Sequence, residues 1–306
     1  MKFLITGGAG FIGSHIARAL ISENKCKPED ITVFDNLSVG KEENIPKGCK
    51  FIKGDLKNKE EIMNALKGID LIFHNAAFVS IRGSFEKLRE EIDTNCSGTL
   101  NVFEACLKNK VKKVVFASSM AVYGEPINLP VDEKHPLNTI SPYGLSKIRG
   151  EMYCRIFEEQ GIDYVILRYF NTYGTKQTPS PYVGVITTFI NQAIDKKPIT
   201  IYGDGNQTRD FIWVEDIAKA NLLAAFSKKN GVYNVASGTE ISINQIAEKI
   251  IESIGGGKEY LPNPFGEITR IKADISLIKK DLGFKPVGKV LEKISELVDF
   301  WRKQKK

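Results

Sequence analysis

Tyr143 and Lys147 are the two residues of this sequence whose types and spacing predict chemistry most directly. They stand four residues apart at the start of a run that we expect to be helical, so both side chains should lie on one face. A lysine ammonium beside a phenol favours the phenolate, and together with the positive charge of an oxidised nicotinamide we expect it to lower the pKa of the tyrosine toward neutrality. Such a tyrosine can act as a general base on the hydroxyl of an alcohol whose carbon gives up a hydride.

A glycine-rich loop near the start of the chain is the second chemical feature. Gly7, Gly10 and Gly13 form a G-x-x-G-x-x-G run between a predicted strand and a predicted helix. Glycines let the backbone approach a pyrophosphate, which the N–H groups and the dipole of a helix N-terminus stabilise. Asp35 ends the next predicted strand, where a carboxylate can bind ribose hydroxyls and would repel a 2′-phosphate. The sequence therefore predicts NAD rather than NADP as the cofactor.

Strand-like and helix-like segments alternate over the first 170 residues and must position these groups. Short apolar runs rich in Val, Ile and Phe predict buried strands at residues 2–6, 31–35, 50–53, 70–74, 113–118 and 164–168. The segments between them predict helices at residues 13–22, 59–66, 85–107 and 142–160. This alternation indicates right-handed βαβ units and an α/β fold with a Rossmann-type, doubly wound parallel sheet.

The rest of the chain is less regular and predicts a smaller α/β domain, partly interleaved with the first. Further helices are expected at residues 214–226, 242–253 and 287–303, the last with one apolar face that should dock on the core. We expect residues 1–170, joined by 211–238, to form the NAD-binding domain. Residues 171–210 and 239–306 should form the substrate-binding domain.

Composition excludes several classes of protein. The chain of 306 residues has a mild formal charge of +6 and no dense basic run interleaved with aromatic residues, so we expect no nucleic-acid partner. The five cysteines form no C-x-x-C pair and the three histidines are scattered, which predicts reduced thiols and no metal site. No apolar stretch approaches the ~20 residues that span a bilayer, and no signal peptide precedes the first predicted strand. We therefore expect a cytoplasmic protein with no membrane partner.

Further motifs resemble the extended short-chain dehydrogenases/reductases, in particular the NAD-dependent epimerase/dehydratase family and, within it, the UDP-glucose 4-epimerases. The resemblance rests on the order and spacing of motifs that span nearly the whole chain. They are the glycine loop, residues 54–56, the H-x-A-A run 74–77, the N-x-x-G-T-x-N-V run 95–102, the S-S-x-x-V-Y-G run 118–124, the Y-x-x-x-K pair, the R-Y-F-N-x-Y-G run 168–174 and residues 201–212.

The resemblance implies roles for the matching residues. Tyr143 would take a proton from a sugar hydroxyl, Lys147 would tune Tyr143 and hold the nicotinamide ribose, and Ser119 would orient the hydroxyl. NAD would contact Gly7, Gly10, Phe11, Ile12, Gly13, Asp35, Asn36, Asp55, Leu56, Asn75, Ala76, Ala77, Asn95, Tyr143, Lys147 and Phe170. The UDP-sugar would contact Ser119, Tyr143, Asn171, Tyr202, Arg209 and Ile271.

The diphosphate of that substrate is expected to pair with Arg209, because a guanidinium binds phosphate oxygens in a bidentate manner. Arg209 could instead form a structural ion pair with a neighbouring aspartate, Asp204 or Asp210. Resembling proteins carry a second arginine where this chain has Pro264.

Arg270 or Lys258 could take the place of that second arginine. Ile271 stands five residues after Gly266, where the resemblance implies a side chain near the C2 substituent of the sugar. Its intermediate bulk would admit UDP-glucose and leave some room for acetamido sugars, unless the residue packs in the core.

Met120 and Ala121 separate the possible reactions. Resembling dehydratases and decarboxylases carry acids at these positions, and neither Met120 nor Ala121 can transfer a proton. The resemblance then implies 4-epimerisation of a UDP-sugar, with UDP-glucose/UDP-galactose first, through a 4-keto intermediate and return of the hydride. The alternatives are 4-epimerisation of UDP-N-acetylglucosamine or UDP-glucuronate, a net NAD-dependent oxidoreductase, and a non-catalytic NAD-binding protein. A homodimer through helices 85–107 and 142–160 is implied by the resemblance alone.

Overall fold

A seven-stranded parallel sheet forms the centre of the larger part of the structure, a computed structural model that describes residues 1–79, 83–178, 184–262 and 268–305. Its strands lie in the order β10-β6-β5-β4-β1-β2-β3, and each neighbouring pair is parallel. They are β1 (Phe3–Thr6), β2 (Ile31–Asp35), β3 (Lys50–Lys53), β4 (Leu71–His74), β5 (Lys113–Ser119), β6 (Asp163–Tyr169) and β10 (Gly231–Val235). The predicted Rossmann-type, doubly wound fold is confirmed.

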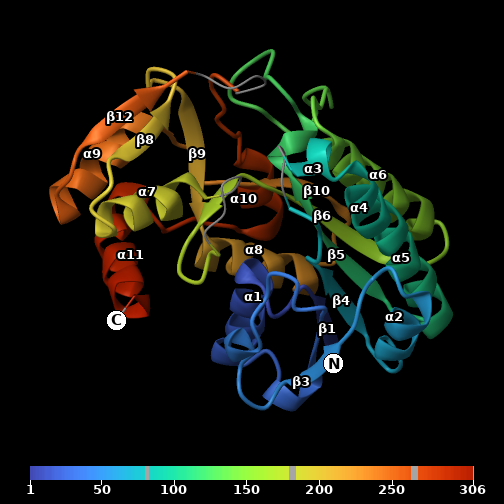
Figure 1. Ribbon diagram of the computed structural model, residues 1–306. Helices are drawn as coiled ribbons and strands as arrows, with labels where there is room; N and C mark the ends of the chain where they lie inside the picture. Colours follow the sequence, from blue (N-terminus) through green and yellow to red (C-terminus); the bar gives the residue numbers. More distant parts are fainter. Residues whose placement is uncertain (80–82, 179–183, 263–267, 306) are drawn as a thin grey trace.

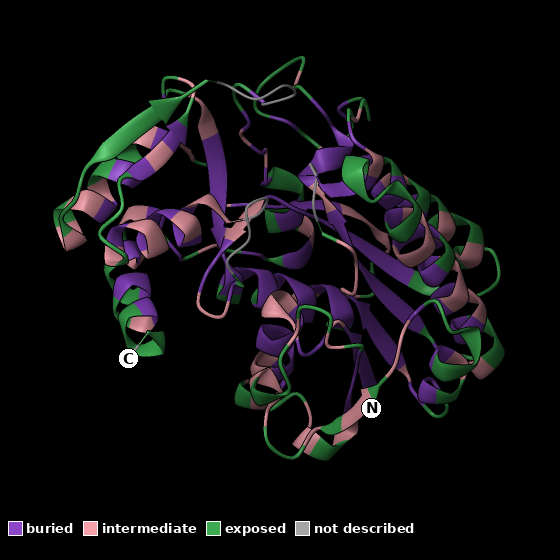
Figure 2. Cartoon of the chain, viewed as in Figure 1, coloured by how far each residue is buried: buried purple, intermediate pink, exposed green. Residues whose placement is uncertain are grey.

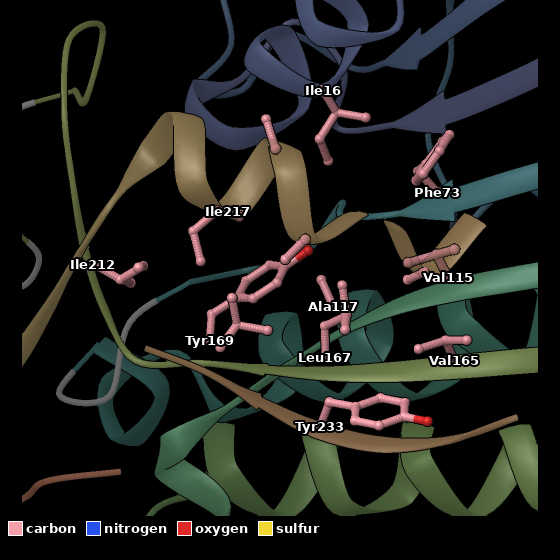
Figure 3. Packing of buried hydrophobic residues seen from close by; sticks show 14 of the residues in the cluster. Ile16, Phe73, Val115, Ala117, Val165, Leu167, Tyr169, Ile212, Ile217 and Tyr233 are labelled. Atoms are coloured by element: carbon pink, nitrogen blue, oxygen red, sulfur yellow. The ribbon is translucent and has the colours of Figure 1, made fainter. Parts of the chain in front are cut away.

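Helices cover both faces of this sheet (Figure 1). On one face lie α1 (Phe11–Ser22) and α8 (Val214–Phe226), and on the other lie α2 (Lys59–Ala65), α5 (Gly98–Asn109) and α6 (Pro142–Glu158). The strands β1, β2 and β4 are buried along their whole length (Figure 2), which explains why their sequences are continuous apolar runs. Figure 3 shows Ile16, Phe73, Val115 and Ile217 in the core that α1 and α8 close.

The smaller part of the structure holds two further sheets. β7 (Asn171–Tyr173), β9 (Thr208–Trp213) and β11 (Glu240–Ser242) form one, and β8 (Ile199–Tyr202) and β12 (Lys258–Leu261) form a parallel pair. The helices α7 (Val185–Ile194), α9 (Ile243–Ile254) and α11 (Val290–Gln304) share one apolar core with β7, β8 and β9, while α10 (Ser276–Leu282) contacts β10.

The apolar face predicted for the last helix is buried at Val290, Ile294, Leu297, Val298 and Trp301. The helix α8 and the strand β10 follow β9 in the chain but belong to the larger part of the structure. β10 is a strand of the large sheet, and α8 packs on one face of that sheet. The division of the chain into two domains at the predicted residues stays a prediction.

The predicted helix 85–107 is interrupted. It begins as α3 (Gly83–Glu86) and α4 (Leu88–Glu91), continues as a π-helix (Ile92–Ser97), and becomes α-helical again in α5. The prediction of one continuous helix was wrong because the wider turn of a π-helix leaves no mark on the apolar pattern. Single π-helical turns are rare and frequently lie at functional sites.

A buried ion pair joins α6 to the middle of the large sheet. The Glu151 carboxylate accepts hydrogen bonds from the Arg168 guanidinium at 2.8 and 2.7 Å and from Ser118 Oγ at 2.6 Å. Arg168 also donates to the Tyr123 hydroxyl at 2.9 Å, and that hydroxyl donates to Asn234 Oδ1 at 2.6 Å. The network links β5, β6 and β10 to the helix whose first turns carry the Y-x-x-x-K pair.

Removing one partner of this pair should destabilise the fold. We expect Glu151→Ala to lower the free energy of unfolding by about 3–5 kcal/mol, because it leaves the Arg168 charge buried without a counter-charge. Glu252→Ala on α9 is a matched control, since it removes an exposed partner of Lys249 and should cost less than ~1 kcal/mol. Urea unfolding followed by circular dichroism measures both losses. Equal losses in the two variants would contradict the importance assigned to the buried pair.

Candidate active site

A cleft of about 1240 Å³ runs along the carboxyl ends of the strands in the large sheet and extends to the smaller part of the structure. Its walls come from the loops after β1, β2, β4, β5 and β6, from the start of α6, and from α7, β8 and β9. The strand order reverses between β1 and β4, and ligands of doubly wound folds bind in the crevice at such a switch point. The cleft therefore lies where the fold predicts a dinucleotide.

The loop after β1 has no room for side chains at its glycines. Gly7 has a φ of +67°, which favours glycine, and a Cβ on Gly13 would lie 2.4 Å from the Gly7 carbonyl oxygen. The helix α1 begins at Phe11 without a side-chain cap, and Phe11 and Ile12 line the cleft beside Gly10. The positive end of the helix dipole is thus placed to bind a pyrophosphate.

Asp35 closes the adjacent wall at the end of β2. Its carboxylate accepts hydrogen bonds from the backbone N–H of Ala9 at 3.0 Å and of Leu37 at 2.8 Å. Burial raises the pKa of Asp35, and these two hydrogen bonds act in the opposite direction. Beyond it, Asn36 donates to Asp55 at 3.2 Å, and both line the cleft together with Leu56. These carboxylates give this end of the cleft a negative charge that disfavours a 2′-phosphate.

Asn75, after β4, has a buried amide nitrogen with no hydrogen-bond partner in the described part of the chain. Its Oδ1 accepts a hydrogen bond from the Tyr169 hydroxyl at 3.3 Å, and Ala76 and Ala77 continue the same wall. Buried donors in native proteins are nearly always paired, so the free Nδ2 indicates an acceptor on a ligand. This donor, the glycine loop and Asp35 together fit a bound dinucleotide.

Tyr143 and Lys147 lie in the first turns of α6, where the sequence predicts them. Ser141 caps the helix by accepting a hydrogen bond from Gly144 N at 3.1 Å, and a proline opens its first turn. Lys147 Nζ donates to the Ala117 carbonyl at 2.9 Å and lies 5.7 Å from the centre of the Tyr143 ring. Ser119, at the end of β5, forms a hydrogen bond with Tyr143. The structure thus brings the three predicted catalytic residues together in the cleft.

Burial dominates the titration of this pair. It raises the pKa of Tyr143 to about 12, although the hydrogen bond with Ser119 lowers it, and it lowers the pKa of Lys147 to about 8. Lys147 alone does not bring the pKa of Tyr143 toward neutrality, because a buried phenolate loses more hydration free energy than its neighbours return. The predicted lowering also counts the positive charge of a bound nicotinamide, and it stays a prediction.

The substrate half of the predicted site is also on the cleft wall. Asn171, Tyr202 and Arg209 line it, and Phe170 lies at its junction with the cofactor half. Arg209 is buried and donates from Nη1 to the Thr208 carbonyl at 2.8 Å. Among the described residues of the lining, Arg209 is the single guanidinium, which fits a diphosphate.

Several polar residues of this half were missed by sequence reasoning. Gln177, Gln192 and Gln207 line the cleft, and Gln207 Nε2 donates to the Tyr202 carbonyl at 2.7 Å. Gln207 belongs to the recognised run 201–212, which could have signalled it, but the other two glutamines stand in segments with no such motif.

Two predicted contacts are not in the cleft. Ile271 is fully buried in the hydrophobic core, and Ile268 lines the cleft in its place, so the expectation that Ile271 contacts the sugar was wrong. Asn95 is buried behind the wall, where its amide bonds the backbone of Phe78 at 2.7 and 3.0 Å and also donates to Glu91.

The expected substitutes for a second arginine are absent from the described cleft lining. Arg270 pairs with Glu240, and Lys258 pairs with Glu248. Pro264 lies outside the residues that the structure describes. Within the described ranges, no group of His, Cys, Asp and Glu side chains could hold a metal ion. None of the helices in those ranges has the length and apolar composition needed to cross a membrane.

The fold and the site together define a Rossmann-type enzyme that binds a dinucleotide and carries the tyrosine, lysine and serine of the short-chain dehydrogenase/reductase class. Residues 3–236 match the family described as NAD dependent epimerase/dehydratase, and the chain belongs to that family. It is an NAD-dependent enzyme of sugar-nucleotide chemistry.

Relatives of the whole chain support this assignment. A Methanocaldococcus jannaschii protein, provisionally named a UDP-glucose 4-epimerase, is 44% identical over 98% of both chains. The structure of a UDP-N-acetylglucosamine 4-epimerase from Methanobrevibacter ruminantium in complex with UDP-N-acetylmuramic acid is 41% identical, has a TM-score of 0.93, and matches 99% of this chain and 98% of its own. A Thermus thermophilus UDP-glucose 4-epimerase in complex with NAD is 35% identical, with a TM-score of 0.92 over 99% of both chains.

The acidic end of the cleft predicts cofactor selectivity. We expect NAD to bind at least about tenfold more tightly than NADP, a difference of roughly 1.4 kcal/mol, because the 2′-phosphate would face the Asp35 carboxylate. Asp35→Asn should narrow this ratio, whereas Asp30→Asn, on a short 3₁₀ turn outside the cleft, should leave it unchanged. Calorimetric titration with each dinucleotide measures the ratio. Equal dissociation constants for NAD and NADP in the unmodified protein would exclude the role assigned to Asp35.

Proposed function

We propose that the enzyme interconverts the C4 epimers of a UDP-hexose, with UDP-glucose and UDP-galactose as the first pair. The observation that carries the proposal is the set of Tyr143, Ser119 and Lys147 on one cleft wall, next to a serine segment that continues with Met120 and Ala121. An epimerase needs one group that removes and returns a proton, whereas elimination or decarboxylation needs further acids.

The remaining acids of the described lining do not offer such a group beside Ser119. They are Asp35 and Asp55, at the end of the cleft beyond the glycine loop, and Glu86, which is exposed on α3. This distribution supports a simple cycle of oxidation and reduction at one carbon.

In this cycle Tyr143 removes the proton of the sugar C4 hydroxyl and later returns it, while Ser119 holds that hydroxyl in place. NAD held along the glycine loop, Asp35 and Lys147 would take up the hydride of C4 and would return it after the keto-sugar has turned its other face toward the cofactor. Lys147 keeps a positive charge beside the tyrosine and binds the nicotinamide ribose. The reaction has no net redox change, so the cofactor should be retained between turnovers.

The uridine diphosphate is proposed to lie in the other half of the cleft, against Asn171, Tyr202 and Arg209. Support comes from the buried guanidinium on β9 and from the relative in complex with UDP-N-acetylmuramic acid. That relative also favours a second candidate reaction, 4-epimerisation of UDP-N-acetylglucosamine. UDP-glucuronate epimerisation and net oxidation stay as alternatives without a supporting contact of their own.

We also propose a homodimer. The helix α6 exposes Leu145, Met152 and Ile156, which stand seven and four residues apart and so fall on one face. Leu88 of α4 and Phe85 of α3 are exposed on neighbouring elements. Light scattering at micromolar concentration decides between this dimer and a monomer of 34.1 kDa.

The catalytic role of Tyr143 predicts a loss of turnover without a loss of cofactor. We expect Tyr143→Phe to lower kcat by at least about 100-fold, because it removes the proton-transfer group but leaves the cleft intact. Tyr153→Phe on the same helix is the control, since Tyr153 packs in the core on the other side. Activity is measured on UDP-glucose, UDP-N-acetylglucosamine and UDP-glucuronate without added cofactor, and bound NAD is measured by extraction. Activity of Tyr143→Phe within about tenfold of the unmodified enzyme, a barrier change of ~1.4 kcal/mol, would mean that another base acts.

The role of Arg209 is tested separately by UDP binding. We expect Arg209→Ala to weaken UDP at least about tenfold with NAD affinity unchanged, because a charge-assisted bidentate contact is lost. Arg209→Lys should retain the charge but only part of the affinity. Arg270→Ala is the control, since Arg270 is an exposed partner of Glu240 outside the cleft lining. Unchanged UDP affinity in Arg209→Ala would place the diphosphate elsewhere.

A further inference from the structure

Glu91, the last residue of α4, is an acidic side chain buried in the wall behind the Tyr143 and Lys147 pair. Only 1% of it is exposed, and both α4 and the π-helix that follows pack against α6 (Figure 1). Glutamates are almost never this deeply buried unless they are paired. The partners of Glu91 therefore indicate why the fold keeps a carboxylate at this place.

The hydrogen-bond partner of Glu91 is Asn95, one π-helical turn further along the chain. Asn95 Nδ2 donates to Glu91 Oε1 at 2.9 Å and to the Phe78 carbonyl at 3.0 Å, while Asn95 Oδ1 accepts from Phe78 N at 2.7 Å. Phe78 lies between Ala77 and Val79, which both line the cleft. The chain of contacts from Glu91 through Asn95 therefore fixes the loop after β4 that forms the cleft wall.

The charge of Glu91 acts on the catalytic pair itself. Burial lowers the pKa of Lys147 to about 8, and the negative charges of Glu91 and Glu151 raise it. The charge of Glu91 also raises the pKa of Tyr143, although burial is the larger cause of its value of about 12. The Glu151 carboxylate is paired with the Arg168 guanidinium, whereas the Glu91 carboxylate is bonded to the neutral amide of Asn95. Of the two acids that act on Lys147, Glu91 is therefore the one whose charge is not paired with a guanidinium in the described part of the chain.

Other titratable groups stand on α4 itself, on the elements that pack against it, and on β4. They are Arg149 and Glu151 on α6, Cys96 in the π-helix, His74 on β4, Arg89 and Glu90 on α4, and Glu86 on α3. His74 is neutral at physiological pH, because burial lowers its pKa to about 3. Arg149 interacts with Cys96, and Glu90 pairs with Lys87 on the exposed side of α4. Lys147 is thus the buried ammonium of this environment.

We propose that Glu91 is a positioning residue of the reaction: its carboxylate is the counter-charge that keeps the Lys147 ammonium in the buried wall, and through Asn95 it holds the cleft loop at Phe78. The proposal deepens the function proposed above and rests on the roles given there to Tyr143 and Lys147. It predicts that Glu91 shifts the pH range of turnover, which a residue needed only for packing would not do.

The decisive comparison is Glu91→Gln, which keeps the size and the acceptor for Asn95 but removes the charge. In protein labelled with ¹³C at the lysine ε carbon, the Lys147 signal is assigned by its loss in Lys147→Arg and titrated by NMR. We expect its midpoint to fall by roughly 1 pH unit in Glu91→Gln, because the ammonium loses its counter-charge. The alkaline limb of the pH profile of kcat should move to lower pH by a similar amount.

Glu90→Gln is the matched control, since Glu90 is the exposed neighbour on α4. Loss of its charge should change neither the titration midpoint of Lys147 nor the pH profile of kcat. An unchanged Lys147 midpoint in folded Glu91→Gln overturns the proposal. If Glu91→Gln does not fold, Glu91→Asp and Glu91→Asn give the same comparison of a charged with a neutral side chain that is one methylene shorter. Equal titration midpoints of Lys147 in these two variants would also overturn the proposal. The NMR titration needs no substrate, so it tests the role of Glu91 independently of the reaction. An unmodified enzyme that is inactive on all three UDP-sugars would contradict the proposed function, and the titration would still decide the role of Glu91.

Discussion

The buried pair of Glu151 and Arg168 is the interaction on which the geometry of the site depends. It fixes α6 against β5 and β6 at the point where the carboxyl ends of these strands meet the cleft. Ser118, bonded to Glu151, immediately precedes Ser119, and Glu151 follows Lys147 by one helical turn. A shift of α6 would therefore move the lysine and the serine relative to each other. Because the pair lies in a dry interior, it defines position more strictly than an exposed ion pair could.

The same dry interior imposes an electrostatic cost on the site. Burial raises the pKa of Tyr143 to about 12 and lowers that of Lys147 to about 8, so it shifts both residues toward their neutral forms, although Lys147 still carries its charge at neutral pH. A buried lysine keeps its charge only if the protein offsets part of the hydration free energy that the ammonium loses. The acids that do so, Glu91 and Glu151, are not part of the cleft lining. The half of the cleft proposed for the substrate presents hydroxyls, amides and one guanidinium instead.

The parts of the structure that follow from local pattern could be predicted from the sequence. Six of the seven strands of the large sheet were predicted, most of them because they are continuous apolar runs buried on both faces, whereas the edge strand β10 was not predicted. The glycine loop, Asp35 and the Tyr143 and Lys147 pair were found because their spacing is itself the requirement for binding or catalysis. The π-helix was missed because its wider turn changes hydrogen bonding and not composition. Ile271 was misplaced because an apolar residue suits a core and a pocket equally well until its neighbours are known. Glu91 stands in a run rich in charged residues, where nothing local distinguishes a buried acid from an exposed one.

Selectivity between sugars must then come from shape more than from charge. The described lining offers a diphosphate one guanidinium, from Arg209. The same lining also contains neutral amides, such as those of Gln177 and Gln192. Neutral amides discriminate by hydrogen-bond direction, which a uridine and a sugar hydroxyl can satisfy in a defined pose. A wall with Val79 and Ile268 can exclude bulk but rejects an added polar group only weakly. Under the proposed function, the room left by this wall would separate hexoses from larger acetamido sugars, so a single change in the volume of the wall would alter the substrate range while the chemistry at Tyr143 stays the same.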